Sequence, residues 1–210
     1  MVFDRFVVGT LQTNCYLLGD PDARKAVAID PGAEGERIAR RVEELGLELV
    51  AILITHAHAD HIKDAWSLKN ALGGKIHMHR ADCVILVHSM VAMGFRHALH
   101  PKWVETSVDV FLNEGDVLQF GSIDLKVIET PGHTPGHVAF HLAAAGFIFV
   151  GDTLLAGSIG RTDFPGGSFS QLIQSVRGKI FPLKGTTVVY PGHGSETTIE
   201  GEIIRNPFFQ

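Results

Sequence analysis

Short apolar runs alternate with amphipathic segments along the whole chain. The apolar runs are rich in β-branched residues and end at glycine, proline or aspartate, which is typical of strands. The amphipathic segments repeat apolar residues every three to four positions, as a helix with one buried face does. The patterns predict strands over 2–9, 13–19, 25–30, 48–54, 76–79, 108–112, 117–120, 123–129, 137–142, 147–150 and 187–190, and helices over 34–45, 60–72, 168–180 and 198–204.

These elements follow one plan twice, with strands, helix, strand and helix in each half. No sequence repeat accompanies the plan, yet it indicates two sheets packed together with helices outside. The segment 81–107 is harder to assign, because its helical spacing breaks from Gly94 onward. It either fills the core, walls a substrate pocket, or forms a subunit contact that would make the protein a homo-oligomer. No function is assigned to His88, His97 and His100.

Composition narrows the class of protein. The chain has 210 residues, which suits one large domain, and a net charge of −5 without a basic run argues against nucleic acid as a partner. The longest apolar runs, such as 145–150, are far too short to span a membrane. Because residues 1–9 lack the layout of a signal peptide, we expect a cytoplasmic protein. Cys15 and Cys83 fit no redox or metal spacing and are expected to be small core residues.

Four residues of ligand type lie within six positions directly after the predicted strand 48–54: His56, His58, Asp60 and His61. Histidines so close together repel one another once charged, and a divalent metal supplies a reason to keep them there. Positions i and i+2 of an extended segment point the same way, and a turn can bring the next two ligands towards the same point. The motif therefore predicts a metal site at a strand end.

Three further strand ends carry a glycine turn and a ligand-type residue, namely His133, Asp152 and His193. Seven ligands are too many for one zinc ion, but they suit two metals about 3.5–4 Å apart. Asp152 is the expected bridge, as the only carboxylate outside the first motif that we place at such a strand end. His137 is left out of the ligand set, as a residue that supports a ligand or packs. No second metal site is assigned to His77 and His79.

The order and spacing of these seven residues resemble the metallo-β-lactamase superfamily, and the resemblance covers nearly the whole chain. Further stretches resemble the short glyoxalase II-like hydrolases of that superfamily: residues 130–137, 151–163, and 191–194 with 206–208. The resemblance implies an α/β (α+β) fold, the αββα four-layer sandwich, with the metals at one edge between the sheets. It also implies one domain over 1–210, without the C-terminal helical domain of the long glyoxalase II enzymes.

The resemblance further implies how the ligands divide. His56, His58 and His133 would hold one metal, Asp60, His61 and His193 the other, and Asp152 would bridge them. The expected function is hydrolysis of S-2-hydroxyacyl thioesters such as S-lactoylglutathione, a small-molecule, glutathione-linked substrate. Two divalent cations make a bridging hydroxide available near neutral pH. The leaving thiolate favours zinc, although iron and manganese suit the same ligands.

Two side chains have expected roles beyond metal binding. Asp60 is the expected catalytic residue, which orients the hydroxide or relays its proton. The resemblance implies that the long glyoxalase II enzymes carry a glutathione-contacting lysine and tyrosine in this region, where the present sequence has Arg161 and Asp163. Arg161 is therefore a candidate substrate-binding residue, which grips a carboxylate or only braces its loop through Asp163.

Three alternatives stay open. Persulfide dioxygenases resemble the chain in the histidine motif and in residues 160–164, and they use one iron, held here by His56, His133 and Asp152. A lactonase shares the whole ligand set. A metal-stabilised binding module without activity would need a closed, fully coordinated site. Oxygen uptake, thioester loss and turnover would separate these possibilities.

Overall fold

The structure of the protein, a computed structural model, describes residues 1–99 and 101–210. His100, to which the sequence analysis assigns no function, lies outside the described residues. The described chain forms two compact units. Unit 1 comprises Met1–Leu112 and Gln119–Ile123, and unit 2 comprises Asn113–Leu118 and Asp124–Gln210. Two six-stranded sheets with helices make up the described chain, so the predicted mixed α/β class is confirmed.

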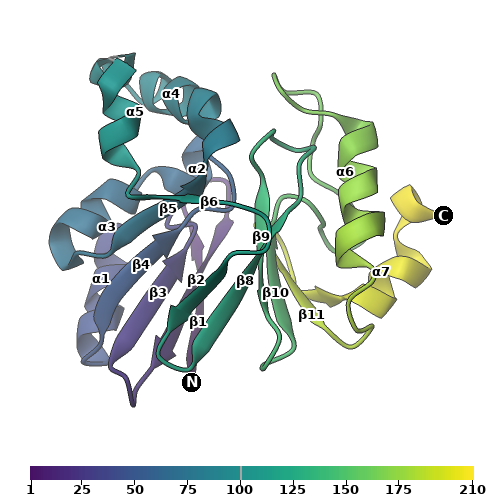
Figure 1. Ribbon diagram of the computed structural model, residues 1–210, viewed down its shortest axis with the longest axis horizontal. Helices are drawn as coiled ribbons and strands as arrows, with labels where there is room; N and C mark the ends of the chain where they lie inside the picture. The colour runs from purple at the N-terminus through teal and green to yellow at the C-terminus, as the bar shows by residue number, and fades with distance from the viewer. Residues whose placement is uncertain (100) are drawn as a thin grey trace. The chain divides into compact units, whose positions relative to one another are not determined.

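The first sheet has the strand order β1-β2-β3-β4-β5-β6. Its first three strands form an antiparallel meander, and β3 to β6 run parallel, so helices connect the later strands. Helices α1 and α3 lie together against this sheet (Figure 1). The elements are β1 (Val2–Val8), β2 (Thr13–Asp20), β3 (Lys25–Ile29), α1 (Gly35–Glu44), β4 (Glu48–Leu53), α2 (Ala59–Ile62), α3 (Ala65–Leu72), β5 (Lys75–His79), η1 (Arg80–Asp82), α4 (Cys83–Ala92), η2 (Arg96–Leu99), α5 (Pro101–Ser107) and β6 (Val110–Leu112).

One predicted helix is wrong in this unit. The single helix expected over 60–72 is two helices, α2 and α3, interrupted at Lys63 and Asp64. The backbone N–H of Asp64 donates to the carbonyl of Pro31 at 3.1 Å, and its carboxylate accepts from Gly35 N–H at 2.8 Å. Tertiary hydrogen bonds to the turn after β3 thus replace the bonds that would continue the helix.

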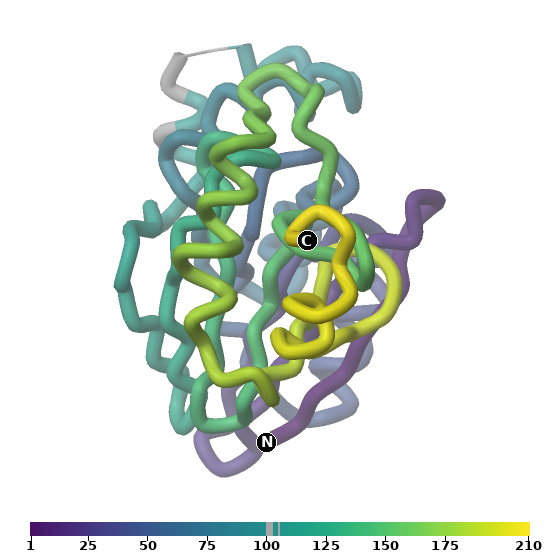
Figure 2. Tube along the Cα trace, turned by 90° about the vertical axis from the view of Figure 1, so that its right-hand side faces the viewer, coloured from purple at the N-terminus to yellow at the C-terminus, as the bar shows by residue number. Residues whose placement is uncertain are grey.

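The second sheet has the order β12-β11-β10-β9-β8-β7, and only the β10–β11 pair is parallel among the pairings that the structure describes. Helices α6 and α7 lie beside one another on this sheet (Figures 1 and 2). The hydrophobic core that these helices share with the sheet contains Ile148, Leu172, Val176 and Ile199. The elements are β7 (Val117–Phe120), β8 (Ile123–Glu129), β9 (Val138–Leu142), β10 (Phe147–Gly151), α6 (Phe169–Ser175), η3 (Val176–Ile180), β11 (Val188–Pro191), β12 (Thr197–Thr198), α7 (Ile199–Arg205) and η4 (Pro207–Phe209).

The structure also bears on segment 81–107, on the two cysteines and on membrane-spanning helices. In segment 81–107, Leu86, Met90 and Ala98 join the hydrophobic core of unit 1, which supports core packing. Cys15 and Cys83 are both free thiols, and burial, followed by the charge of Asp30, raises the pKa of Cys15 well above its usual range. Among the described residues, no helix has the length and apolar character that crossing a bilayer requires.

Candidate metal centre

The four ligand-type residues after β4 gather at one point of unit 1, and we call them the first cluster: His56, His58, Asp60 and His61. The ring centroid of His56 lies 4.8 Å from that of His58 and 4.1 Å from that of His61. Nε2 of His61 lies 3.5 Å from Oδ2 of Asp60. His56 and His61 are fully buried, whereas the side chain of Asp60 is 24% exposed. The predicted convergence of these four side chains is therefore present.

The backbone of the first cluster is held from two sides. The N–H of Ala57 donates to the buried Asp82 at 2.8 Å, and Ser89 donates to the carbonyl of Ala57 at 2.7 Å. A Cβ on Gly32 would overlap the carbonyl oxygen of Asp60, so the turn after β3 approaches α2 as closely as only glycine allows. These contacts fix the direction in which His56 and His58 leave the chain.

Asp30, at the end of β3, organises the imidazoles of the first cluster. Its carboxylate accepts from the N–H and the hydroxyl of Thr55, at 2.8 and 2.6 Å, and from Nδ1 of His61 at 2.9 Å. Since the hydroxyl of Thr55 donates to Asp30, Nδ1 of His56 donates to that hydroxyl, 3.1 Å away. Both imidazoles therefore carry the proton on Nδ1 and present Nε2 as a ligand atom.

Three predicted ligands gather in unit 2, and we call them the second cluster: His133, Asp152 and His193. Nε2 of His133 and Nε2 of His193 each lie 3.6 Å from Oδ2 of Asp152. Asp152 follows β10 and His193 follows β11, and these two strands are parallel neighbours. A backbone bond of 2.7 Å from Gly192 to Gly151 ties the two strand ends together. Carboxyl ends of adjacent parallel strands thus place the two residues side by side.

His133 is oriented by the loop after β10. Its Nδ1 donates to the carbonyl of Arg161 at 2.6 Å, so Nε2 is again the expected ligand atom. A Cβ on Gly160 would overlap the carbonyl of Asp152 and come within 3.1 Å of Nδ1 of His133. Glycine at this position therefore lets the loop close over both ligands.

His137, which the sequence analysis left out of the ligand set, supports Asp152. The N–H of Asp152 donates to Nε2 of His137 at 3.1 Å. Nδ1 of His137 lies 2.9 Å from the hydroxyl of Thr130 and 3.0 Å from that of Thr153. Because Nε2 accepts a hydrogen bond, the proton of this imidazole sits on Nδ1. The buried ring thereby positions the backbone that carries the expected bridging carboxylate.

The donor sets of both clusters fit divalent cations. Around a tetrahedral ion with bonds of 2.0–2.1 Å, two ligand atoms lie about 3.4 Å apart. The three imidazole–carboxylate separations, 3.5, 3.6 and 3.6 Å, are close to that value and long for direct hydrogen bonds. Imidazole nitrogen and carboxylate oxygen also suit zinc, iron and manganese. That the two clusters form one binuclear centre stays a prediction.

Several residues that hydrogen-bond to the first cluster were not predicted from the sequence. Asp82, Ser89 and Thr13, whose hydroxyl donates to Asp60 at 2.9 Å, carried no local signal. Asp30 did carry one, since it ends a strand and precedes Pro31-Gly32 like the other turns. The premise that Asp152 was the only such carboxylate outside the motif is therefore wrong. Both aspartates follow strands, and Asp30 contacts Nδ1 of His61 whereas Asp152 faces the Nε2 atoms of His133 and His193.

Arg161 forms a local pair rather than a contact with either cluster through its guanidinium. Its Nε and a terminal nitrogen donate to both carboxylate oxygens of Asp163, at 2.9 and 2.8 Å, and the guanidinium lies over the ring of Phe164. This pairing raises the pKa of Arg161 and lowers the pKa of Asp163. Both side chains are about two-thirds exposed. The bracing role is present, and a role in substrate binding stays a prediction.

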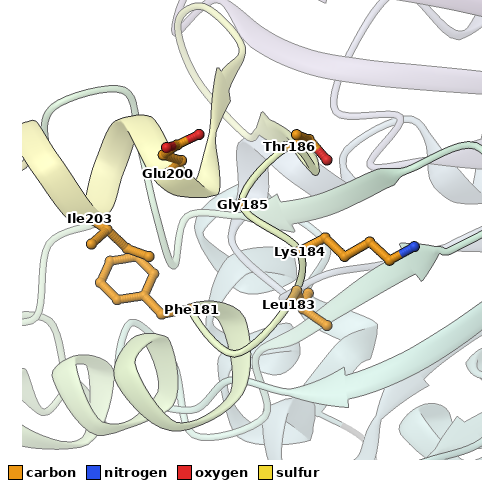
Figure 3. A pocket seen from close by; sticks show the side chains of 7 residues that line it. All are labelled: Phe181, Leu183, Lys184, Gly185, Thr186, Glu200 and Ile203. Carbon is orange, nitrogen blue, oxygen red and sulfur yellow. The ribbon is translucent and has the colours of Figure 1, made fainter.

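Each unit contains a pocket. The pocket of unit 1 has a volume of about 350 Å³ and is lined in part by Asp60. The pocket of unit 2, about 650 Å³, lies between the loop that follows η3 and α7 (Figure 3). Lys184, Thr186 and Glu200 line it, and it includes no residue of the second cluster. Only the pocket of unit 1 therefore adjoins an expected metal ligand among these two.

Comparison with known proteins gives one family match, two curated relatives and one solved structure. The family description "Metallo-beta-lactamase superfamily" matches residues 8–193. Hydroxyacylglutathione hydrolase GloC of Haemophilus influenzae is 39% identical over 96% of this chain and 94% of its own length. The mitochondrial persulfide dioxygenase ETHE1 of Mus musculus is 37% identical over 93% of this chain and 70% of its own. The crystal structure of TTHA1623 in a di-iron-bound form superposes with a TM-score of 0.82 and 33% identity, covering 98% of this chain and 99% of that one.

Proposed function

Since the chain belongs to the metallo-β-lactamase superfamily, we propose that it is a binuclear metal-dependent hydrolase of S-2-hydroxyacyl thioesters, with S-lactoylglutathione as the type substrate. The 39% identity to a hydroxyacylglutathione hydrolase, which extends over nearly the whole chain, supports the substrate class. The superfamily also accounts for the fold class that the sequence motifs implied.

The proposed centre combines the two clusters. His56, His58 and His133 would hold one divalent cation, Asp60, His61 and His193 the other, and Asp152 would bridge them. The equal separation of Oδ2 of Asp152 from Nε2 of His133 and Nε2 of His193, 3.6 Å each, is the observation that carries the proposal. When bound, two such cations lower the pKa of water and polarise a carbonyl group. Zinc is the proposed metal, and iron is the first alternative because a relative of known structure holds two iron ions.

The side chains of the protein then position the reactants. The carboxylate of Asp60, held by the hydroxyl of Thr13, accepts the proton of the attacking water. Water oxygen bonds to the carbonyl carbon, the carbon–sulfur bond breaks, and the thiolate leaves to take up a proton, so acid and thiol are the products. Asp30 and Thr55 keep His56 and His61 in the tautomer that the centre needs. Arg161 is proposed to bind a substrate carboxylate in competition with Asp163.

The test is metal analysis paired with thioester hydrolysis on the purified protein. We expect two metal ions per chain and loss of the thioester absorbance of S-lactoylglutathione. Asp152→Ala should bind fewer than two metal ions per chain and lose nearly all activity, because both proposed ions lose a ligand. Retention of two metals by this variant would contradict the bridging role, and an inactive, fully metallated wild type would contradict the hydrolase.

A second candidate is a mononuclear iron persulfide dioxygenase. The identity to ETHE1 and the stretch 160–164 favour it. It would use His56, His133 and Asp152 for one iron. Oxygen uptake with glutathione persulfide by the iron-loaded protein, at one metal per chain and without thioester loss, would decide for this activity. A lactone substrate in the same assay series tests the lactonase alternative.

A further inference from the structure

The pocket of unit 1 adjoins the first cluster and has no role in the centre proposed above. It lies among the turn that joins β1 to β2, the turn after β3, and helix α2. Asp60 lines it, and the side chain of Asp60 is partly open to solvent. With a volume of about 350 Å³, it is at the lower end of the range for small-molecule sites. Its position next to an expected ligand makes it a candidate substrate subsite.

Two threonines, Thr10 and Thr13, one acid, Asp60, and one cation are the polar side chains among the residues that line the pocket. Val8, Leu11, Ala33 and Met93 line it, and Leu11 is 65% exposed at the tip of the turn. Such a surface suits a short carbon chain rather than a strongly hydrated group. The contribution of Met93 also shows that part of segment 81–107 walls a pocket, one of the interpretations that the sequence left open.

Lys63 is the cation of this pocket. It follows Asp60 by three residues, and its N–H donates to the carbonyl of Ala59, so one helical turn places the two side chains on the same side. Lys63 is exposed and forms no ion pair with any residue in the described part of the chain. By contrast, Lys69 is paired with Asp109 at 2.6 Å. The charge of Lys63 is thus available to a ligand.

Neighbouring acids are already engaged. Glu34 accepts from Gly9 N–H and is paired with Arg37 at 2.8 Å, and Asp64 accepts from Gly35 N–H. Asp60 is the expected metal ligand. An incoming anion therefore meets one uncommitted ammonium group beside an apolar surface.

We propose that this pocket binds a carboxylate-bearing arm of the thioester substrate, with the Lys63 ammonium group paired to that carboxylate. The inference rests on the proposed thioesterase function. The carboxylate belongs either to the thiol part of the substrate, as in glutathione, or to the acyl part, and one experiment distinguishes the two.

Three thioesters are compared on the metal-loaded protein. S-lactoylglutathione carries carboxylates in its thiol part, S-succinyl-N-acetylcysteamine carries one in its acyl part, and S-lactoyl-N-acetylcysteamine carries none. Lys63→Gln should raise KM about five- to tenfold for one charged substrate, with kcat unchanged, and leave the neutral substrate unaffected. Lys63→Arg should restore most of the loss. Lys126→Gln, which removes an exposed charge on β8, is the matched control and should change none of the three.

The outcome assigns or overturns the subsite. An effect confined to the glutathione thioester places the thiol part in the pocket, and an effect confined to the succinyl thioester places the acyl part there. Equal changes for all three substrates, or none, overturn the role of Lys63.

Calorimetric binding of the thioether analogues, with CH₂ in place of the thioester carbonyl, separates the two proposals. If the wild type hydrolyses no thioester but binds a charged analogue in a Lys63-dependent way, the thioesterase function fails and the anion subsite stands. If Lys63→Gln binds the charged analogues as tightly as the wild type, the subsite fails whatever the activity.

Discussion

At the scale of single residues, the hydrogen bond that one ring nitrogen of an imidazole forms decides which nitrogen it offers as the expected ligand atom. His61 donates from Nδ1 to Asp30, His56 to the hydroxyl of Thr55, and His133 to the carbonyl of Arg161. Each partner is an oxygen acceptor, so each ring offers Nε2. The ligand-type residues were readable from the chain, whereas these partners lie up to 31 residues away from their histidines.

Asp30→Asn tests this arrangement. The amide replaces one acceptor oxygen by a donor. Either the N–H of Thr55 loses its acceptor, or the hydroxyl of Thr55 and Nδ1 of His61 lose theirs together and the tautomer preference weakens. We expect metal affinity to fall about 10- to 100-fold, measured by chelator competition, with a smaller loss of stability. Asp124→Asn, at an exposed position of β8, is the control and should bind metal as the wild type does. Unchanged affinity in Asp30→Asn would contradict the orienting role.

At the scale of elements, the expected ligands follow the ends of strands, and three glycines there approach other parts of the chain more closely than a larger residue could. Gly32 meets α2, Gly132 meets the backbone of Leu172, and Gly160 meets Asp152. The strand ends were predicted to within one or two residues, because apolar runs and turn residues are local signals. The break between α2 and α3 was missed, because its cause is a hydrogen bond from Asp64 to the distant Pro31.

Gly32→Ala should destabilise the protein by about 3 kcal/mol and reduce metal binding, since the added methyl group overlaps the carbonyl of Asp60 and pushes α2 away. Urea unfolding and metal titration measure the two effects. Gly178→Ala is the matched control. It lies exposed in the helical turn η3 with nothing near its Cβ position, and we expect it to stabilise by about 0.5–1 kcal/mol. Equal stability of the two variants would rule out the close approach.

At the scale of the whole molecule, each unit has its own sheet, its own helices and one cluster. In the proposed centre each cation takes ligands from both units, so neither cluster alone supplies the full ligand set of either cation. Metal binding should therefore couple the two units energetically. Cytoplasmic location and homo-oligomer formation stay predictions from the sequence.

Hydrogen exchange followed by mass spectrometry tests that coupling. Zinc added to the metal-free protein should slow exchange in residues 54–62 of unit 1 and in residues 150–164 and 191–194 of unit 2. In Asp152→Ala the protection of 54–62 should also be lost, although the substitution lies in unit 2. Full protection of unit 1 by zinc in this variant would mean that the first cluster binds metal by itself.

Acid stability follows from Asp20. Its carboxylate accepts from the N–H groups of Ala23, Ser122 and Asp22, and these bonds hold its pKa well below the ordinary value. The unfolded carboxyl group takes up a proton first, so the stabilisation is complete above about pH 4 and is lost as the pH falls towards the lower folded pKa. We expect the urea midpoint of the wild type to drop between pH 5 and pH 2.5, and Asp20→Asn to reduce that slope. A slope unchanged in Asp20→Asn, as expected for the exposed control Asp22→Asn, would assign acid sensitivity to other groups.

The sequence by itself determined nearly all strands, the helices α1, α6 and α7, the seven ligand-type residues and the family, because apolar periodicity, turn residues and motif spacing are local features of the chain. The tertiary structure decided what those residues touch: that Asp30 orients two histidines of the first cluster, that His137 holds the backbone of Asp152, and that Arg161 is engaged with Asp163. Hydrogen bonds between distant segments depend on strand order and register, which pair residues that no local pattern links. The position of Lys63 in a pocket was likewise decided only by the tertiary structure, because the pocket exists only where separate turns meet.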